Sequence, residues 1–447
     1  MSESLTHAAP DRRTWSPWRV VVGFGTISLA ADMVYEGGRS LYGPLLSSLG
    51  ASALAVGAIT GAGEAVALLL RLGSGVLADR SRRYWTVTIA GYALTAVCVP
   101  LLAVTPYLGA AGLAVAAVLI LAERTGKAVR SPAKSALLAE AAQHVGMGRG
   151  LGVHKALDQI GAFAGPLLVA GVVALAGAVL WPGFAVLAVP GAVAMVLLVL
   201  TRHRMPSEQP AAARPRATVP MGGLPAAFWL FAVASAICTA GLVTFGLISF
   251  HLVDAGIVPA AGAPLLYAAA MAAGAVAALL TGEAYDRVGP RTLLALPVLV
   301  AAVPPLAFAG GLAAVTGGVL LWGAAVGLQD STVKALVADL VRPDRRATAF
   351  GLFAAVQGVG ALVGGIATGA LYEQSIRSLD RRHRHPGRRR RPPRHPLPPL
   401  GHQPVAGQAR STGAPARRAL GISATLSTVA SRWASRSSGA SELRSTE

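Results

Sequence analysis

Two short charged stretches lie inside apolar runs of this 447-residue sequence. The first is ADMVYEGGRS, residues 31–40, and the second is AERTGKAVRSP, residues 122–132. Both place acids and bases three or four residues apart, so an α-helix puts most of them on one face. Charges of both signs in an apolar setting can carry a proton or hold a polar solute, and the candidates are Asp32, Tyr35, Glu36, Arg39, Glu123, Arg124, Lys127 and Arg130.

Three of these residues are candidates for proton coupling. Asp32 and Glu36 lie one helical turn apart, and their mutual repulsion favours a proton on one of them. Glu123 precedes Lys127 by four residues, the order that favours an ion pair within a helix. We expect proton coupling to use Asp32, Glu36 and Glu123. The alternative is that the charges, Lys127 and Arg130 above all, form salt bridges that only hold helices together.

The composition shows what kind of element must position these residues. The chain is 54% hydrophobic and only 13% charged, whereas a soluble domain carries about 25% charged residues. Unbroken apolar runs long enough to cross a bilayer recur along it, and unbroken runs favour helices over strands. We predict an all-α membrane protein with eleven spans: 18–38, 52–71, 86–105, 108–130, 152–176, 182–201, 226–252, 263–281, 292–310, 313–333 and 349–371.

Charge in the connecting segments gives an orientation. Lys and Arg gather in the loops on one side of the predicted spans, whereas the opposite loops up to residue 376 hold Arg39 and little else. Because positive residues remain on the cytoplasmic side, the N-terminus is expected there. We predict a multi-pass protein of the cell (plasma) membrane.

Glycine motifs recur at a fixed distance and divide the chain in two. Gly75-x3-Asp79-Arg80 returns 207 residues later as Gly282-x3-Asp286-Arg287. The series Gly152, Gly161, Gly165 and Pro166 returns 199 residues later at positions 351, 360, 364 and 365. Two motif pairs in the same order indicate structural repeats. The predicted parts are a cytoplasmic N-terminus (1–17), a six-helix bundle (18–201), a linker (202–225), a five-helix bundle (226–372) and a tail (373–447).

These motifs resemble those of the major facilitator superfamily of secondary transporters, which consist of two six-helix repeats. GVLADRSRR is similar to the signature between helices two and three of that family, matching it at Gly75, Leu77, Ala78, Asp79, Arg80 and Arg83. It departs at Arg82, where the family has glycine. The series at 152–166 resembles the glycine-proline motif of the antiporters, although Val169 and Ala170 replace its closing glycine pair.

The resemblance implies roles for these residues. It also adds Arg124 to the proton-coupling candidates, because this position resembles the span-four arginine implicated in proton transfer in antiporters. The two Asp-Arg motifs would form a latch that closes one face of the transporter; the alternative is that they are solvated, positively charged loops. The latch residues are Gly75, Asp79, Arg80, Arg83, Gly282, Asp286 and Arg287. Gly152, Gly161, Gly165 and Pro166 would pack one helix closely on its neighbour. Helices one, four, seven and ten would line a cavity, and helix ten adds Gln329 and Asp330 to Tyr35, Arg39, Lys127 and Arg130 as substrate-cavity candidates. Asp158, at the start of span five, completes this set.

The function expected from the resemblance is proton-coupled efflux, or antiport, of a small molecule by alternating access. The alternatives are a proton-coupled importer of a small anionic solute and a truncated, non-functional chain of this family. The sequence shows no nucleotide-binding loop, catalytic pair or metal-ligand cluster. We therefore expect no enzyme activity, cofactor, metal or nucleic-acid partner, and a monomer whose partners are its substrate, protons and the lipid bilayer.

The end of the sequence breaks the pattern where a twelfth helix is expected. From Arg377 to Glu447 there are fifteen arginines and three acids, a net charge of +12 out of +19 for the whole chain. A disordered Arg/Pro-rich tail is one interpretation. The other is a shifted reading frame in GC-rich coding DNA, with the last helix lost.

Overall fold

The computed structural model describes residues 15–81, 83–205, 224–342 and 345–383. The predicted tail beyond residue 383 and the centre of the linker lie outside these residues. The described elements belong to one compact unit, residues 1–385. They are α1 (Pro17–Ser48), α2 (Ala53–Ser81), α3 (Tyr84–Leu101), α4 (Gly112–Gln143), α5 (Met147–Leu175), α6 (Trp181–Ala185), α7 (Ala188–Arg204), α8 (Ala226–Gly241), α9 (Phe245–Asp254), α10 (Gly262–Val288), α11 (Ala295–Ala307), α12 (Leu312–Leu328), α13 (Lys334–Leu340) and α14 (Arg346–His383).

Ten stretches of the described chain are long and apolar enough to cross a membrane. One of them, Gly262–Ala307, has 46 residues, and a straight helix of that length would measure about 70 Å, more than twice the hydrocarbon core. Gly289 interrupts it with a φ of +67°, a backbone conformation that glycine adopts without steric cost. This stretch therefore contains two passes, α10 and α11. Each of the eleven predicted spans is helical over most of its length.

Two spans in the second half depart from a regular helix. Leu242 to Thr244 adopt extended backbone between α8 and α9, so this pass is broken near its middle. Gln329–Val333 form a π-helical turn between α12 and α13. Such irregular backbone is tolerated at membrane depth where it is enclosed by protein or lines a cavity, and it often marks a functional position.

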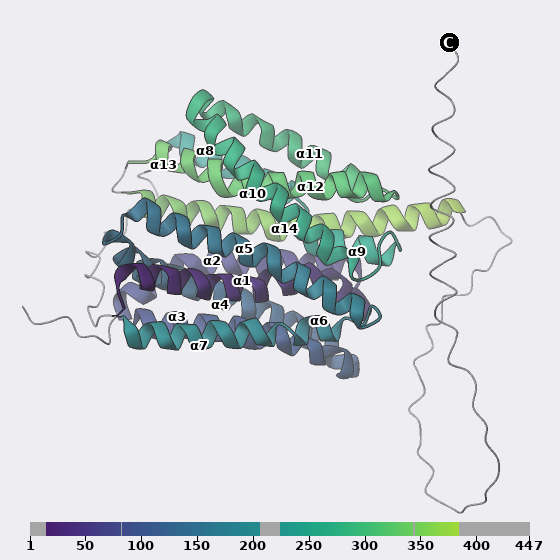
Figure 1. Ribbon diagram of the computed structural model, residues 1–447. Helices are drawn as coiled ribbons and strands as arrows, with labels where there is room; N and C mark the ends of the chain where they lie inside the picture. The colour runs from purple at the N-terminus through teal and green to yellow at the C-terminus, as the bar shows by residue number, and fades with distance from the viewer. Residues whose placement is uncertain (1–14, 82, 206–223, 343–344, 384–447) are drawn as a thin grey trace, which may run out of the picture. The chain divides into compact units, whose positions relative to one another are not determined.

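Helix α1 is the most enclosed span. In its apolar window 72% of the residues are buried, against 33–44% in the other spans. It packs against α5, α7 and α9, and α14 packs along α2; Figure 1 shows α14 as one long helix that α10 crosses in this view. Charged side chains near the middle of α1 are therefore surrounded by protein rather than by lipid, which lowers their insertion cost.

The glycines of the second motif pair bring helices into backbone contact. A side chain at Gly161 or Gly165 on α5 would collide with the backbone of Leu29 or Met33 on α1. Gly360 and Gly364 on α14 meet Ala236 and Ala240 on α8 in the same way. The partners on α1 and on α8 are separated by the same offset as the two Asp-Arg motifs, so both halves build the same contact.

Candidate functional site

Residues on α1 and α2 form the first part of a buried charge network. Nη2 of Arg39 lies 2.6 Å from Oε1 of Glu64 on α2, and Nη1 of Arg39 lies 3.7 Å from Oε2 of Glu36. Arg39 therefore stands between two carboxylates. Glu64 is in the second predicted span but is not among the predicted site residues.

Helix α4 completes this network with three charged residues. Nη1 of Arg124 lies 3.5 Å from the same Oε1 of Glu64 and donates a hydrogen bond to the Tyr35 hydroxyl. The Lys127 ammonium lies over the Tyr35 ring, 3.2 Å from its centre, a cation–π contact. The charge network, defined as Tyr35, Glu36, Arg39, Glu64, Glu123, Arg124 and Lys127, thus joins α1, α2 and α4.

Glu123 is the network member whose charge is least compensated. Its side chain is fully buried, and neither carboxyl oxygen has a hydrogen-bond partner among the described residues. The nearest cation is Arg124, with Nε 3.5 Å from Oε2 of Glu123. The predicted ion pair with Lys127 is replaced by the contact of Lys127 with Tyr35. An ionised carboxylate in such a place costs several kcal/mol.

The second half contacts the network through an aromatic cluster, formed by Phe245, Tyr267 and Trp322. The Tyr267 hydroxyl on α10 donates a hydrogen bond to Oε2 of Glu36. The Tyr267 ring packs against Phe245, with ring centres 4.4 Å apart, and Phe245 packs against Trp322 at 5.4 Å. Tyr267 was missed because one tyrosine in an apolar run carries no distinctive pattern.

Two residues beside this contact, Trp322 and Val243, occupy places that correspond to charged residues of the first half. Trp322 corresponds to Glu123 at the offset of the glycine series, and its Nε1 donates to the Val243 carbonyl at 2.7 Å. Val243 corresponds to Glu36 at the offset of the Asp-Arg motifs, and it lies in the break between α8 and α9. The first half thus has carboxylates at these two positions of the repeat. The second half has the Trp322 indole in place of Glu123, and in place of Glu36 it has Val243, whose backbone carbonyl lies outside a helix.

The remaining predicted polar residues on α1 and α4 point to other helices. Asp32 lies near Asp158 on α5. Nζ of Lys155 lies 2.8 Å from Oδ2 of Asp158. Arg130 donates to Thr95 and lies over the Tyr92 ring on α3.

The two candidates near α13 lie on the π-helical turn. Nε2 of Gln329 donates to Oγ1 of Thr239 on α8 at 3.4 Å, and Asp330 is exposed. Thr239 is the residue of the second half that corresponds to Asp32. The structure therefore sets Gln329 beside α8 rather than beside the predicted acids of α1.

The residues of the two Asp-Arg motifs lie near the ends of α2 and α10. A Cβ atom at Gly75 would lie 3.7 Å from the Pro132 ring of α4; Arg80 and Arg83 are exposed, and the side chain of Asp79 lies outside the described part. In the second motif, Gly282 faces open space and Asp286 is exposed. Nη2 of Arg287 lies 2.5 Å from Oε1 of Glu283 on the same helix.

The four residues of the glycine-proline motif divide in their contacts. Gly161 and Gly165 make the backbone contacts with α1 described above, and Pro166 is buried within α5. Gly152 is exposed, and a side chain there would meet nothing within 4 Å. Two of the three glycines therefore determine the packing of α5 on α1.

The two halves are in contact at the end where α1 ends and α2 begins. Oγ1 of Thr60 lies 2.8 Å from Oγ1 of Thr244, and the Leu54 amide donates to Oε1 of Glu373 at 2.8 Å. A side chain at Gly57 would collide with the Gly365 backbone on α14. Backbones this close leave no opening between these segments.

The fold, its repeat and its motifs agree with a comparison with known proteins. The family model described as Major Facilitator Superfamily matches residues 28–365. The chain belongs to the major facilitator superfamily. Members of this superfamily are secondary transporters of small molecules, so the chain is a multi-pass membrane transporter of this type.

Two relatives in sequence support this membership. An uncharacterised protein of Mycobacterium tuberculosis is 50% identical over 387 residues, which cover 84% of this chain and 92% of that protein. An uncharacterised MFS-type transporter of Methanocaldococcus jannaschii is 27% identical over 361 residues, covering 78% of this chain and 88% of that protein.

Solved structures show the same fold at low sequence identity. A mutant form of the nucleoside transporter NupG is 16% identical, with a TM-score of 0.63 over 79% of this chain and 92% of that one. A bacterial homologue of the human lysosomal transporter Spinster, in an inward-facing and unoccupied conformation, is 14% identical, with a TM-score of 0.62 over 84% and 85%.

Proposed function

We propose that this transporter exports a small molecule from the cytoplasm in exchange for protons. The observation that carries the proposal is the buried charge network, which holds three carboxylates and contacts the second half through the bond from Tyr267 to Glu36. Buried carboxylates within a membrane usually serve transport or proton relay. We place the protein in the plasma membrane with a cytoplasmic N-terminus.

Competition between proton and substrate at Glu36 and Glu123 would couple the two fluxes. When Glu36 is ionised, Arg39 and the Tyr267 hydroxyl compensate its charge, and the bond to Tyr267 ties α1 to α10. A proton on Glu36 removes its attraction to Arg39 and weakens that tie. A substrate that displaces this proton leaves Glu36 ionised again and restores the contact between α1 and α10. Differential stabilisation of the two conformations is what a coupled transporter needs.

The closed end of the structure is consistent with this direction of transport. With the N-terminus in the cytoplasm, the contacts from Leu54 to Thr60 lie on the outer face. A conformation closed on that face receives its substrate from the cytoplasm. We propose that the two bundles, residues 18–201 and 226–372, rock about the site, and that the Asp-Arg motifs, Gly75 to Arg83 and Gly282 to Arg287, latch the opposite face in the other conformation.

Everted membrane vesicles provide the test. The lumen is acidified by respiration, the pH gradient is followed with a quenched acridine dye, and candidate lipophilic cations, nucleosides, sugars and small carboxylates are added outside. Antiport predicts that a substrate restores fluorescence, and that Glu36→Gln and Glu123→Gln abolish the response at equal protein abundance. Arg291→Gln, which changes an exposed charge outside the network and outside the other candidate sites, serves as control. A response unchanged in both carboxylate variants contradicts the proposal.

Import of a small anionic solute is the second candidate, because the network also holds three cations, Arg39, Arg124 and Lys127. A symporter does not release lumenal protons when its substrate is added to the cytoplasmic face of everted vesicles. It instead accumulates a labelled anion in right-side-out vesicles when the external medium is acidified. The two assays distinguish the directions of proton flow.

A further inference from the structure

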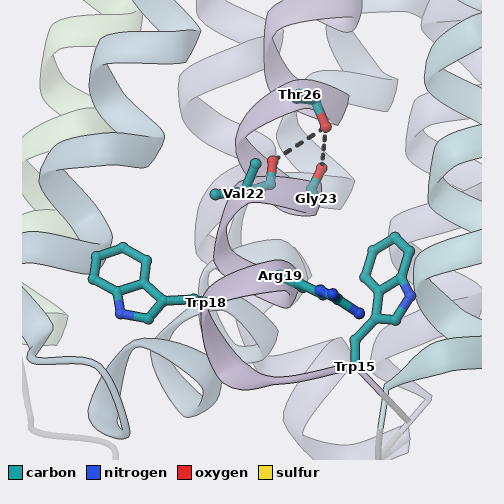
Figure 2. Close-up of a pocket in the computed structure, with 6 residues that line it drawn as sticks. All are labelled: Trp15, Trp18, Arg19, Val22, Gly23 and Thr26. Carbon is teal, nitrogen blue, oxygen red and sulfur yellow. Dashed lines mark hydrogen bonds between the residues drawn. The ribbon is translucent and has the colours of Figure 1, made fainter. Parts of the chain in front are cut away.

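A pocket at the beginning of α1 is separate from the charge network. It has a volume of about 510 Å³ and is lined by Trp15, Trp18, Arg19, Val22, Gly23 and Thr26, here called the tryptophan pocket. Figure 2 shows the two indole rings on opposite sides of the helix, with Arg19 between them. A pocket of this volume is large enough for a small ligand or part of a lipid.

Neighbouring helices flank the pocket on two sides. The Trp15 amide donates to the Arg204 carbonyl at the end of α7, at 2.8 Å. A Cβ atom at Gly23 would lie 2.9 Å from the Trp15 ring and 3.1 Å from the Thr201 hydroxyl of α7. On the other side, Gly25 is in close contact with Leu157 of α5. The pocket is thus a groove over the first turns of α1.

The two ends of the pocket differ in polarity. Arg19 is exposed at the end of the pocket nearest the start of α1, and it forms no ion pair with any residue in the described ranges. The adjoining last turn of α7 adds exposed Arg202, His203 and Arg204. Within the part of the chain that the structure describes, no acidic residue lines the pocket. This end therefore favours a negatively charged group.

The inner end is apolar. Val22 is 42% exposed and presents a hydrocarbon side chain. The Thr26 hydroxyl donates to the carbonyls of Val22 and Gly23 at 3.1 and 2.9 Å, as the dashed lines in Figure 2 show. Its hydrogen is therefore used within the helix, which leaves the threonine methyl group to contact an apolar ligand.

Because the pocket lies at the first turns of an apolar span, we expect it at the boundary between headgroups and acyl chains. Thr26 follows Arg19 by two helical turns, which is about 10 Å along a helix, enough to pass from the headgroup layer into the hydrocarbon. Tryptophans gather at this boundary because their rings are apolar and their N–H groups are polar. Basic pockets near helix ends bind anionic lipid headgroups.

We propose that the tryptophan pocket binds one phospholipid with a net negative headgroup. Its phosphate contacts Arg19 and the basic end of α7, and the first part of an acyl chain lies along Val22, Gly23 and Thr26 between Trp15 and Trp18. The proposal does not depend on the direction or coupling of transport, because no residue of the charge network lines the pocket.

Native mass spectrometry of the purified full-length protein tests the proposal. The protein is titrated with phosphatidylglycerol and with phosphatidylcholine of the same chain composition. We expect one retained phosphatidylglycerol, binding about fivefold weaker in Arg19→Gln, from the contribution of one basic residue near a membrane surface, and absent in Val22→Trp, which fills the groove. Arg291→Gln removes an exposed charge elsewhere and should bind as the wild type does.

Several outcomes would overturn the proposal. Equal retention of both lipids would remove headgroup recognition, and an equal loss in Arg19→Gln and Arg291→Gln would indicate a general effect of charge. Displacement by millimolar inorganic phosphate would indicate an anion site without a lipid. Quenching by phosphatidylglycerol brominated on its acyl chains gives a second measurement with a conservative variant: the quenching should fall in Trp18→Phe, and an unchanged value counts against the site.

Discussion

The Tyr267 hydroxyl on α10 donates a hydrogen bond to the Glu36 carboxylate on α1. Both side chains are buried, and they belong to different halves of the chain. The protonation state of Glu36 therefore affects the strength of the contact between the two halves. In a buried setting, the loss of one partner leaves the other unsatisfied, which costs about 1–3 kcal/mol.

Replacing Tyr267 with phenylalanine should uncouple the halves while keeping the aromatic packing with Phe245. We expect proton-linked transport in everted vesicles to fall at least tenfold, with little change in protein abundance. Tyr107→Phe, at an exposed tyrosine, is the matched control. Full activity in Tyr267→Phe would show that this hydrogen bond does not contribute to coupling.

Glu123 and Glu64 should differ in their effect on stability. Glu64→Gln removes the ionic contacts with Arg39 and Arg124, and should lower the free energy of unfolding by about 1.5–3 kcal/mol. Glu123→Gln removes a buried carboxylate without hydrogen-bond partners among the described residues. It should leave the melting temperature in detergent unchanged or raise it, although it abolishes coupled transport. A lower melting temperature for Glu123→Gln than for Glu64→Gln would contradict this interpretation of the network.

The glycine-proline motif should tolerate substitution at one glycine and not at another. Gly165→Leu forces a side chain into the Met33 backbone and should cost more than the roughly 1–3 kcal/mol of ordinary overpacking, so that little folded protein is recovered. Gly152→Ala, in open space on the same helix, should raise stability by about 0.5–1 kcal/mol. Size-exclusion profiles and melting temperatures measure both. Similar behaviour of the two variants would show that α5 does not pack on α1 through Gly165.

The contact between the two halves at the end where α1 ends can be tested by cross-linking. Oγ1 of Thr60 on α2 lies 2.8 Å from Oγ1 of Thr244 at the beginning of α9, close enough for a disulfide between Thr60→Cys and Thr244→Cys. In a background with Cys98 and Cys238 replaced by serine, we expect this pair to form a disulfide in the absence of substrate. The reduced, intact pair should support transport, and the oxidised pair should not. Transport unaffected by oxidation would mean that this end stays closed throughout the cycle.

Most of the fold followed from the sequence because lipid restricts the possibilities. A span must satisfy its own backbone hydrogen bonds, so each long apolar run predicted one helix. The offsets of the two motif pairs reappear in the contacts of Gly161 with Leu29 and of Gly360 with Ala236. The break at Val243 and the π-helical turn at Gln329 were not predicted, because neither contains a distinctive pattern of proline or glycine.

The site was predicted as a set of residues but not as a set of contacts. Helical spacing placed Asp32 and Glu36 on one face of α1, yet Asp32 lies near Asp158 on α5, while Glu36 contacts Arg39 and Tyr267. Spacing also favoured a bond between Glu123 and Lys127. Instead, the Lys127 ammonium lies over the Tyr35 ring. Tyr35 is on α1, so the spacing of charges within α4 could not predict this contact.

The central claim is that substrate and proton compete at the charge network. The most direct measurement is proton release when a transported substrate is added to purified protein in weakly buffered detergent solution, followed with a pH indicator. The account predicts that the wild type releases protons, and that Glu36→Gln and Glu123→Gln bind the same substrate and release fewer or none. Saturable substrate binding by the wild type without proton release would contradict it.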